Sequence, residues 1–131
     1  MDREELLARA RAVRDRAYAP YSGFRVGAAL LGASGKVYTG CNVESASYGL
    51  TICAERAAVS AAVAAGETRF EAVAIASEGS GPVAPCGACR QVLAEFEPDL
   101  QVWSEGGGVR VEWRLGQLLP EPFRGMPERD G

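Results

Sequence analysis

Apolar and polar positions along the chain alternate between a helical and a strand period. Residues 2–17 place apolar side chains at helical spacing, with acids early, arginines late and Asp2 as the cap; the stripe comprises Leu6, Ala10, Val13 and Ala17. Residues 24–31 and 36–42 have the period of a strand, and the Gly-rich turn between them predicts a hairpin.

The rest of the chain continues this alternation, after a loop predicted at residues 43–52, where no period is clear. The expected elements are a helix from about Cys53 to Gly66, a strand at 70–77, a loop at 78–85, a helix from Pro85 or Cys86 to Phe96, strands at 101–104 and 109–113, and a short helix at 115–120. The link 105–108 is too short for a parallel crossover, so the last two strands are expected to be antiparallel. This order predicts an α/β fold with one central sheet between helices.

Composition narrows the class of protein. A chain of 131 residues suits a single domain over residues 1–131, with a loose tail from about residue 124. The net charge of −3 argues against a polyanionic partner. No window approaches the ~20 apolar residues that span a bilayer. The first residues are too charged for a secretory signal, so we expect a cytoplasmic protein without nucleic-acid or membrane partners.

The chain holds four cysteines and no histidine. Cys53, Cys86 and Cys89 fall at the starts of two predicted helices, where the positive end of the helix dipole stabilises a thiolate. If these helices pack side by side, the three thiolates suit Zn²⁺ and leave its fourth tetrahedral position open. Cys41, at a strand end, is interpreted as a small buried apolar residue. A structural zinc site that Cys41 closes is the alternative.

Glu55 follows Cys53 by two residues, inside the first turn of the same predicted helix. A carboxylate there can take a proton from a zinc-bound water and deliver it elsewhere, which predicts a catalytic metal site. Acids are also common in first turns because they suit the helix dipole. Two non-catalytic interpretations therefore stay open: a zinc-stabilised module, and a thioredoxin-like redox protein that uses the CGAC pair.

Three segments, FRVGAALL, CNVESASYGLTICAER and PCGACRQVL, together resemble the small three-cysteine cytidine deaminases, a class of zinc enzymes whose signature combines CAE with PCGAC. The resemblance runs from about Tyr18 to Phe123. It implies a three-layer α/β/α fold with a mixed five-stranded sheet, one zinc ion per subunit and a homotetramer. It also implies hydrolysis of cytidine, and of 2′-deoxycytidine, to the uridine nucleoside and ammonia in pyrimidine salvage. A deaminase of blasticidin-type antibiotics is the related alternative.

The resemblance assigns roles to individual residues. Cys53, Cys86 and Cys89 hold the zinc ion, and Glu55 carries protons between water, the ring and the leaving ammonia. The remaining assignments are Phe24 against the base, Asn42 and Glu44 on the ribose hydroxyls, the backbone N–H of Ala54 on the base carbonyl, and Ala46, Tyr48 and Phe123 in the pocket of a neighbouring subunit.

Arg56 and Arg90 are assigned a role on physical grounds. A zinc ion with three thiolates carries one net negative charge, which weakens its power to acidify water. Arg56 comes directly after Glu55, and Arg90 directly after Cys89. Both guanidinium groups are expected to donate hydrogen bonds to the thiolates and so to offset that charge.

Overall fold

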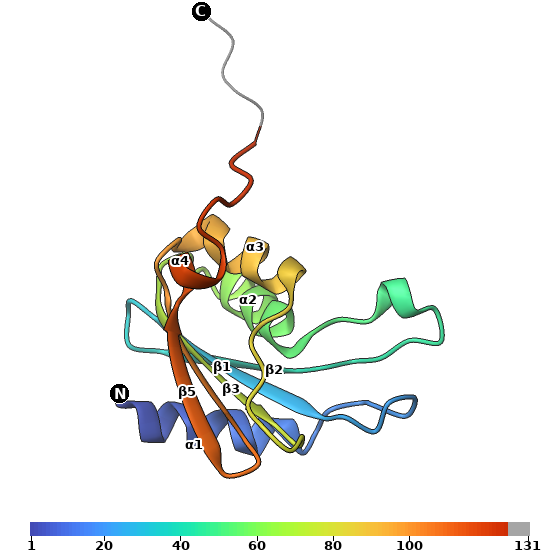
Figure 1. Cartoon of the computed structure of the whole chain (residues 1–131). Helices are drawn as coiled ribbons and strands as arrows, with labels where there is room; N and C mark the ends of the chain where they lie inside the picture. Colours follow the sequence, from blue (N-terminus) through green and yellow to red (C-terminus); the bar gives the residue numbers. More distant parts are fainter. Residues whose placement is uncertain (126–131) are drawn as a thin grey trace, which may run out of the picture.

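The computed structural model describes residues 1–125, which form a five-stranded sheet with helices on both faces (Figure 1). Its elements are α1 (Arg3–Arg14), β1 (Val26–Gly32), β2 (Val37–Cys41), the short 3-10 turn η1 (Tyr48–Leu50), α2 (Ala54–Ala64), β3 (Phe70–Ser77), α3 (Gly87–Phe96), β4 (Gln101–Gly106), β5 (Val109–Arg114) and α4 (Leu115–Leu118). The loose tail predicted from about residue 124 falls mostly on residues 126–131, which lie outside the described residues.

The sheet is mixed. Its strand order is β2-β1-β3-β4-β5. Strand β1 runs antiparallel to both β2 and β3, β3 runs parallel to β4, and β4 runs antiparallel to β5. A parallel pair needs a crossover, and α3 supplies it between β3 and β4. The expected mixed sheet with an antiparallel last pair of strands is confirmed.

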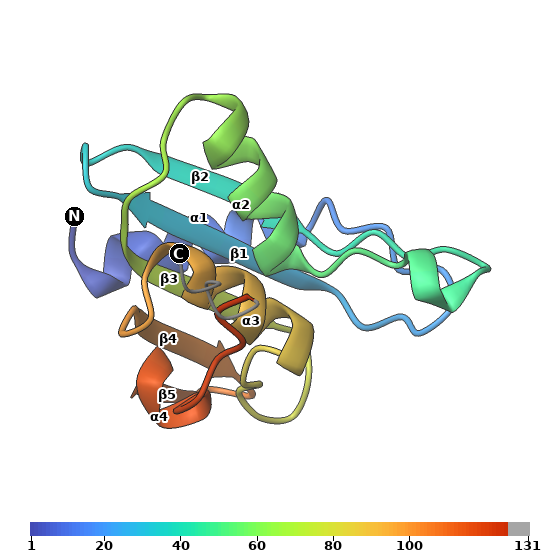
Figure 2. The same cartoon turned by 90° about the horizontal axis from the view of Figure 1, so that it is seen from above.

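Helices cover both faces of the sheet and give three layers. Figure 2 shows α2 and α3 side by side on one face, with α1 behind the other. Side chains along β1 alternate between the two faces of the sheet and contribute to both hydrophobic clusters. Ala28 and Leu30 pack with residues of α2 and α3, whereas Ala29 and Leu31 pack against α1. All four are 6 % exposed or less. Burial on both faces explains why β1 reads as a nearly continuous apolar run.

Two glycines let the helices approach the sheet closely. A Cβ atom at Gly27 would lie 2.0 Å from the Ala10 carbonyl oxygen in α1. A Cβ atom at Gly40 would lie 2.6 Å from the Ala54 carbonyl oxygen in the first turn of α2. Neither contact leaves room for a side chain, so Gly40 helps to set the position of the α2 N-terminus.

Several expected boundaries were wrong; the last helix, for example, ends at Leu118 rather than at residue 120. Helix α1 ends at Arg14, so Ala17 lies outside it, because the chain turns away and the Tyr18 N–H pairs with the Asn42 carbonyl. Strand β1 begins at Val26 rather than residue 24. Strand β4 extends to Gly106, so only two residues join it to β5. Gly107 and Gly108 both have positive φ (59° and 77°), as a tight hairpin turn requires.

In the described part of the chain, none of the helices combines the length and the apolar character needed to cross a membrane.

Candidate active site

The thiols of Cys53, Cys86 and Cys89 converge at the N-termini of α2 and α3. Cys53 is the residue that caps α2, Cys86 caps α3, and Cys89 lies in the first turn of α3. The Sγ atoms of Cys53 and Cys86 are 3.7 Å apart, and those of Cys86 and Cys89 are 3.4 Å apart. All three sulfurs lie within 4.8 Å of one another. The predicted convergence of two helix starts is therefore present.

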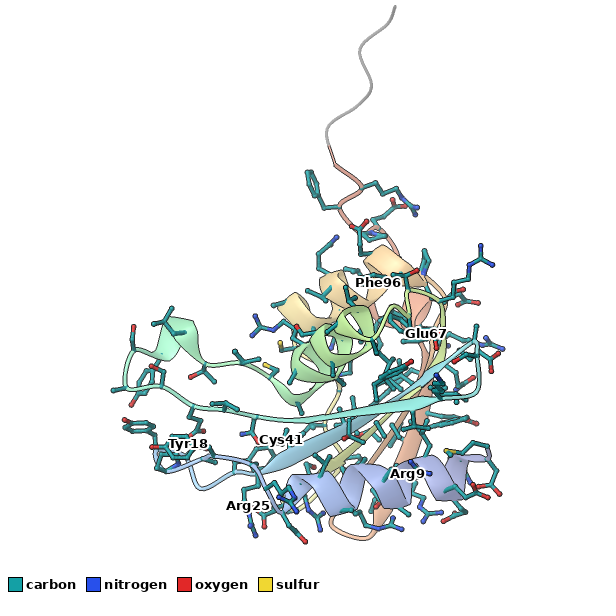
Figure 3. All side chains as sticks on the ribbon, turned by 180° about the vertical axis from the view of Figure 1, so that it is seen from behind. Arg9, Tyr18, Arg25, Cys41, Glu67 and Phe96 are labelled. Carbon is teal, nitrogen blue, oxygen red and sulfur yellow. The ribbon has the colours of Figure 1, made fainter. Side chains whose placement is uncertain are left out.

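The separation of the sulfurs fits a zinc ion. Sulfur ligands about 2.3 Å from a tetrahedral zinc ion lie about 3.8 Å from one another. The observed separations of 3.7 Å and 3.4 Å are of that size. Within the described residues, the group of potential metal ligands around these sulfurs comprises the three cysteines alone. Cys41 is outside the group, half-buried at the end of β2 (Figure 3), so the alternative of a four-cysteine structural site is not supported.

The environment favours the ionised form of the Cys53 sulfur. Hydrogen bonds from the Cys89 thiol and from Arg56 lower the pKa of Cys53 to about 5. The same bond from Cys89 to Cys53 raises the pKa of Cys89, because the proton is held between two sulfurs. A metal ion that replaces this proton would take all three sulfurs as thiolates.

Glu55 is buried in the first turn of α2. The residue is only 5 % exposed, and burial raises the pKa of its carboxyl to about 6. A carboxyl with a pKa near neutrality can both accept and donate a proton at physiological pH. Glu55 is thus the protein group at this site that is suited to proton transfer.

The two arginines differ in what they contact. A guanidinium nitrogen of Arg56 lies 3.6 Å from the Cys53 Sγ atom and also donates to the Thr51 carbonyl, 3.3 Å away. Arg90 instead donates from Nε to the Pro85 carbonyl at 2.7 Å and from Nη1 to the Leu118 carbonyl at 2.9 Å. The expected hydrogen bond from Arg90 to a thiolate was wrong, since two backbone carbonyls occupy its guanidinium.

Asn42 holds the segment that leads into β1. Its Oδ1 atom accepts from the Val26 N–H at 2.8 Å, and its Nδ2 atom donates to the Phe24 carbonyl at 2.9 Å. The residue is buried, at 9 % exposure. Asn42 therefore fixes the backbone of Phe24, and one amide hydrogen and one lone pair remain for another partner.

Glu44 and Ser22 also hold the segment before β1, and together with Asn42 they form a scaffold around Phe24. Ser22 was not identified from the sequence. The Glu44 carboxylate accepts from the N–H groups of Tyr21 and Ser22, at 2.9 Å and 3.1 Å, and from the Ser22 hydroxyl. The Ser22 oxygen accepts in turn from the Phe24 N–H at 3.0 Å. The Ser22 hydroxyl is the strongest influence that lowers the pKa of Glu44. The sequence PYSG signalled only a helix break, and nothing in it marked Ser22 as a partner of Glu44.

A cavity of about 330 Å³ lies beside this scaffold, lined by Tyr21, Ser22, Glu44, Tyr48 and Thr51. The loop between β2 and α2, which carries η1, projects from the body of the molecule (Figure 2). Tyr48 is 76 % exposed on this loop, and Ala46 is exposed beside it. Phe123 is not brought to this cavity; it lies against α3, with its backbone bonded to Gln91.

The three-layer fold and the cysteine trio define a class of α/β protein that can hold a metal ion at two helix N-termini. The sequence pattern of the cytidine and deoxycytidylate deaminase zinc-binding region matches residues 1–104, and the chain belongs to this family.

Individual proteins of this family are similar to this chain over most of their length. The cytidine deaminase of Sporosarcina psychrophila is 53 % identical over 125 residues, which cover 94 % of this chain and 92 % of that protein. The crystal structure of cytidine deaminase from Burkholderia pseudomallei superposes with a TM-score of 0.90 at 50 % identity, and covers 94 % of this chain and 100 % of its own. A blasticidin-S deaminase of Bacillus cereus is 31 % identical over 103 residues, 72 % of this chain and 74 % of that protein.

Proposed function

We propose that this protein catalyses the zinc-dependent hydrolytic deamination of cytidine and 2′-deoxycytidine, with uridine or 2′-deoxyuridine and ammonia as products, in pyrimidine salvage. One observation carries the proposal: the buried carboxyl of Glu55 lies in the helical turn that Cys53 begins, beside three thiols that leave a tetrahedral ion one open position. The cytidine deaminase that is 53 % identical supports cytidine as the substrate.

Zinc and protein have separate tasks in this proposal. Cys53, Cys86 and Cys89 hold the ion, and the bound ion supplies a Lewis acid that lowers the pKa of a water molecule to near ~7. Glu55 accepts a proton from water as the water oxygen bonds C4, and delivers that proton to ring N3. It then passes the second proton of the water to the amino nitrogen as the C4–N bond breaks and ammonia leaves. Because burial raises the pKa of Glu55 to about 6, its carboxyl can exchange a proton in both directions near neutral pH.

The nucleoside would be bound by groups around the scaffold. Phe24 packs against the base, and Asn42 and Glu44 bond the sugar hydroxyls. The N–H of Ala54 bonds the base carbonyl, because an N–H in the first turn of a helix has no acceptor within the helix. Glu44 supports this placement because it is one of the residues that line the cavity of about 330 Å³.

The same proposal extends to the assembly. We infer a homotetramer of single-domain subunits in the cytoplasm, in which Ala46, Tyr48 and Phe123 contact a neighbouring subunit's site. The exposure of Tyr48 (76 %) and Phe123 (67 %) supports a contact surface there, since large exposed aromatic side chains are costly in water. Light scattering after size-exclusion chromatography measures the oligomeric state directly, and a monomer would contradict the proposed homotetramer.

The first experiment is turnover of cytidine by the purified, zinc-containing protein, followed by the loss of ultraviolet absorbance as cytidine becomes uridine. Glu55→Gln should reduce kcat by about 100- to 10,000-fold with zinc content unchanged. Glu71→Gln, exposed on β3, is the matched control and should retain full activity. Absence of turnover by the zinc-loaded protein would overturn the proposal.

A related substrate is the second candidate, favoured by the similarity to the blasticidin-S deaminase. Its identity to this chain, 31 %, is lower than that of the cytidine deaminase, so cytidine is expected to be the better substrate. Parallel assays with cytidine and blasticidin S compare kcat/KM for the two. A higher kcat/KM for blasticidin S would make the antibiotic, rather than cytidine, the proposed substrate.

A further inference from the structure

The side chain of Gln91 is bonded at both ends to the backbone of one residue, Phe123. Gln91 Nε2 donates to the Phe123 carbonyl at 2.7 Å, and Gln91 Oε1 accepts from the Phe123 N–H at 3.0 Å. A side-chain amide thus pairs with a peptide in the way that a neighbouring strand would. A carboxamide offers a donor and an acceptor together, whereas a carboxylate offers acceptors only.

Arg90, the neighbour of Gln91, binds the start of the segment 118–123, whose last residue is Phe123. Its Nη1 atom donates to the carbonyl of Leu118, the last residue of α4. Such a carbonyl at a helix C-terminus lacks a partner within the helix. The same guanidinium holds the Pro85 carbonyl, directly before Cys86. Residues 118–123 are therefore tied at two points to α3, the helix that begins at a metal-site cysteine.

The ring of Phe123 stays exposed although its backbone is fixed. The residue is 67 % exposed. Together with Val92 and Phe96 of α3 it borders a hollow of about 570 Å³ on the surface. An aromatic side chain on a backbone that is already ordered loses less entropy when it binds, so it binds more tightly than the same side chain on a loose segment.

We infer that Gln91 is a positioning residue: by holding the peptide of Phe123 it presents the aromatic ring to the substrate site of a second copy of the chain. Gln91 itself touches no substrate. The inference rests on the proposed function and on the proposed assembly, and it assigns Gln91 an effect on substrate binding rather than on the chemical step.

The test uses the zinc-containing protein and cytidine. Gln91→Ala removes both bonds and should raise KM about five-fold or more, with kcat within about two-fold of the unchanged protein. Gln91→Glu keeps an acceptor for the Phe123 N–H but sets a carboxylate against the Phe123 carbonyl, so its KM should rise at least as much. Gln101→Ala, which removes a glutamine from β4, is the matched control and should leave KM unchanged.

A double-mutant cycle separates positioning from a general structural defect. In a Phe123→Ala background, Gln91→Ala should change KM by less than about two-fold, because the ring that Gln91 positions is already gone. The inference would be overturned if the KM increase in the double variant equalled the product of the increases in the two single variants. An unchanged KM in Gln91→Ala would also overturn it. Zinc content and oligomeric state should be the same in all variants, and a loss of zinc in Gln91→Ala would also overturn it.

Hydrogen exchange distinguishes failure of this inference from failure of the proposed function. Exchange at the Phe123 amide should accelerate about ten-fold or more in Gln91→Ala, whatever the substrate of the protein is. Unchanged exchange would show that the tie is absent in solution and overturn the inference alone. Faster exchange in a protein without cytidine turnover would locate the failure in the proposed function.

Discussion

The aromatic ring of Phe24 lies directly on the backbone of Gly79. A Cβ atom at residue 79 would be 2.8 Å from the Phe24 Cε1 atom and 3.3 Å from Cζ, so a side chain there would displace the ring. Gly79 belongs to the loop between β3 and α3, which leads into Cys86. This contact joins the residue proposed to pack on the base to the loop that carries a metal-site thiol.

We predict that Gly79→Ala weakens nucleoside binding. The added methyl group moves the Phe24 ring away from its position, so KM for cytidine should rise about three- to ten-fold while kcat changes less. Gly81→Ala is the control in the same loop, because a Cβ atom there meets open space. Steady-state kinetics of the two variants make the comparison, and equal KM values would refute a role for this contact.

The sheet and the cysteine trio could be predicted because each has a local sequence signal. Alternating or continuous apolar runs mark β1 and β3, and Cys53 and Cys86 each stand directly before a helix. Helix starts favour thiolates whatever the tertiary structure, so the three candidate metal ligands could be proposed from the chain alone, and Glu55 with them because it lies in the first turn after Cys53.

The contacts between loops could not be predicted in this way. Ser22 bonds Glu44, and Arg90 bonds the Leu118 carbonyl 28 residues away; no period or spacing links the members of either pair. Arg90 was assigned to a thiolate because it follows Cys89 in the sequence. On a helix, however, consecutive side chains point in different directions, about 100° apart, and Arg90 turns toward Pro85 and Leu118 instead.

The raised pKa of Glu55 predicts a dependence of stability on pH. Its folded-state pKa of about 6 lies above the ordinary 4.5, so the folded protein binds a proton at Glu55 more tightly than the unfolded chain does. The resulting stabilisation is fully present below pH 4.5 and is lost as pH rises through about 6. In Glu55→Gln the loss is absent. The free energy of unfolding of Glu55→Gln, relative to the unchanged chain, should therefore rise by about 1 kcal/mol between about pH 5 and about pH 8.

Urea unfolding of the zinc-free proteins measures this difference. Zinc is removed so that its binding does not add to the stability of either protein. Glu95→Gln serves as the control, because Glu95 is exposed on α3. A difference between Glu55→Gln and the unchanged chain that stays constant with pH would show that burial does not raise the pKa of Glu55.

Arg56→Gln is predicted to weaken zinc binding. The guanidinium lies 3.6 Å from the Cys53 sulfur and helps to lower the pKa of that thiol. Without it the Cys53 thiolate should form at higher pH, and zinc affinity should fall about 10- to 100-fold. Competition with a chelator measures the affinity, and thiolate absorbance in the zinc-free protein measures the titration. Arg9→Gln, on the exposed side of α1, should leave both unchanged.

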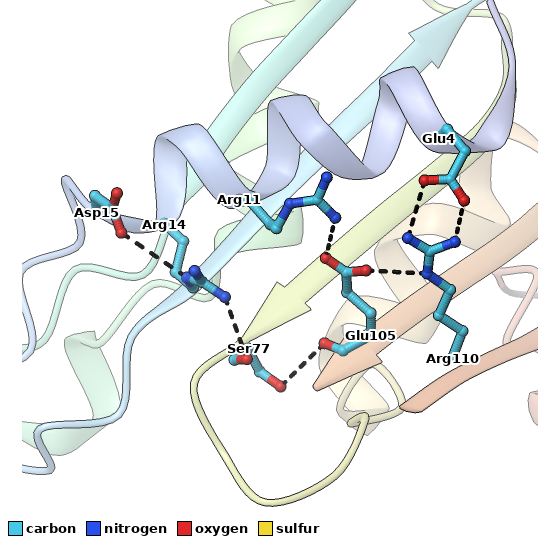
Figure 4. Close-up of polar contacts among 7 residues, drawn as sticks. All are labelled: Glu4, Arg11, Arg14, Asp15, Ser77, Glu105 and Arg110. Carbon is cyan, nitrogen blue, oxygen red and sulfur yellow. Dashed lines mark hydrogen bonds and ion pairs between the residues drawn. The ribbon is translucent and has the colours of Figure 1, made fainter. Parts of the chain in front are cut away.

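Glu105 is predicted to stabilise the fold without affecting the cysteine site. Its carboxylate bonds Arg11 of α1 and, at 3.2 Å, Arg110 of β5, and Arg110 continues to Glu4 (Figure 4). The Glu105 side chain is 14 % exposed, so water screens these pairs less than it screens ordinary surface pairs.

Glu105→Gln should therefore lower the free energy of unfolding by about 1 kcal/mol, because two arginines lose a shared anion. Glu4→Gln is the matched control at the exposed end of the same network, where the side chain is 57 % exposed, and should have a smaller effect. Activity and zinc content should stay unchanged in both variants, since α1 covers the face of the sheet opposite α2 and α3. Urea unfolding at low and high salt gives the test. If Glu4→Gln were as destabilising as Glu105→Gln, the exposed end of the network rather than Glu105 would stabilise the attachment of α1.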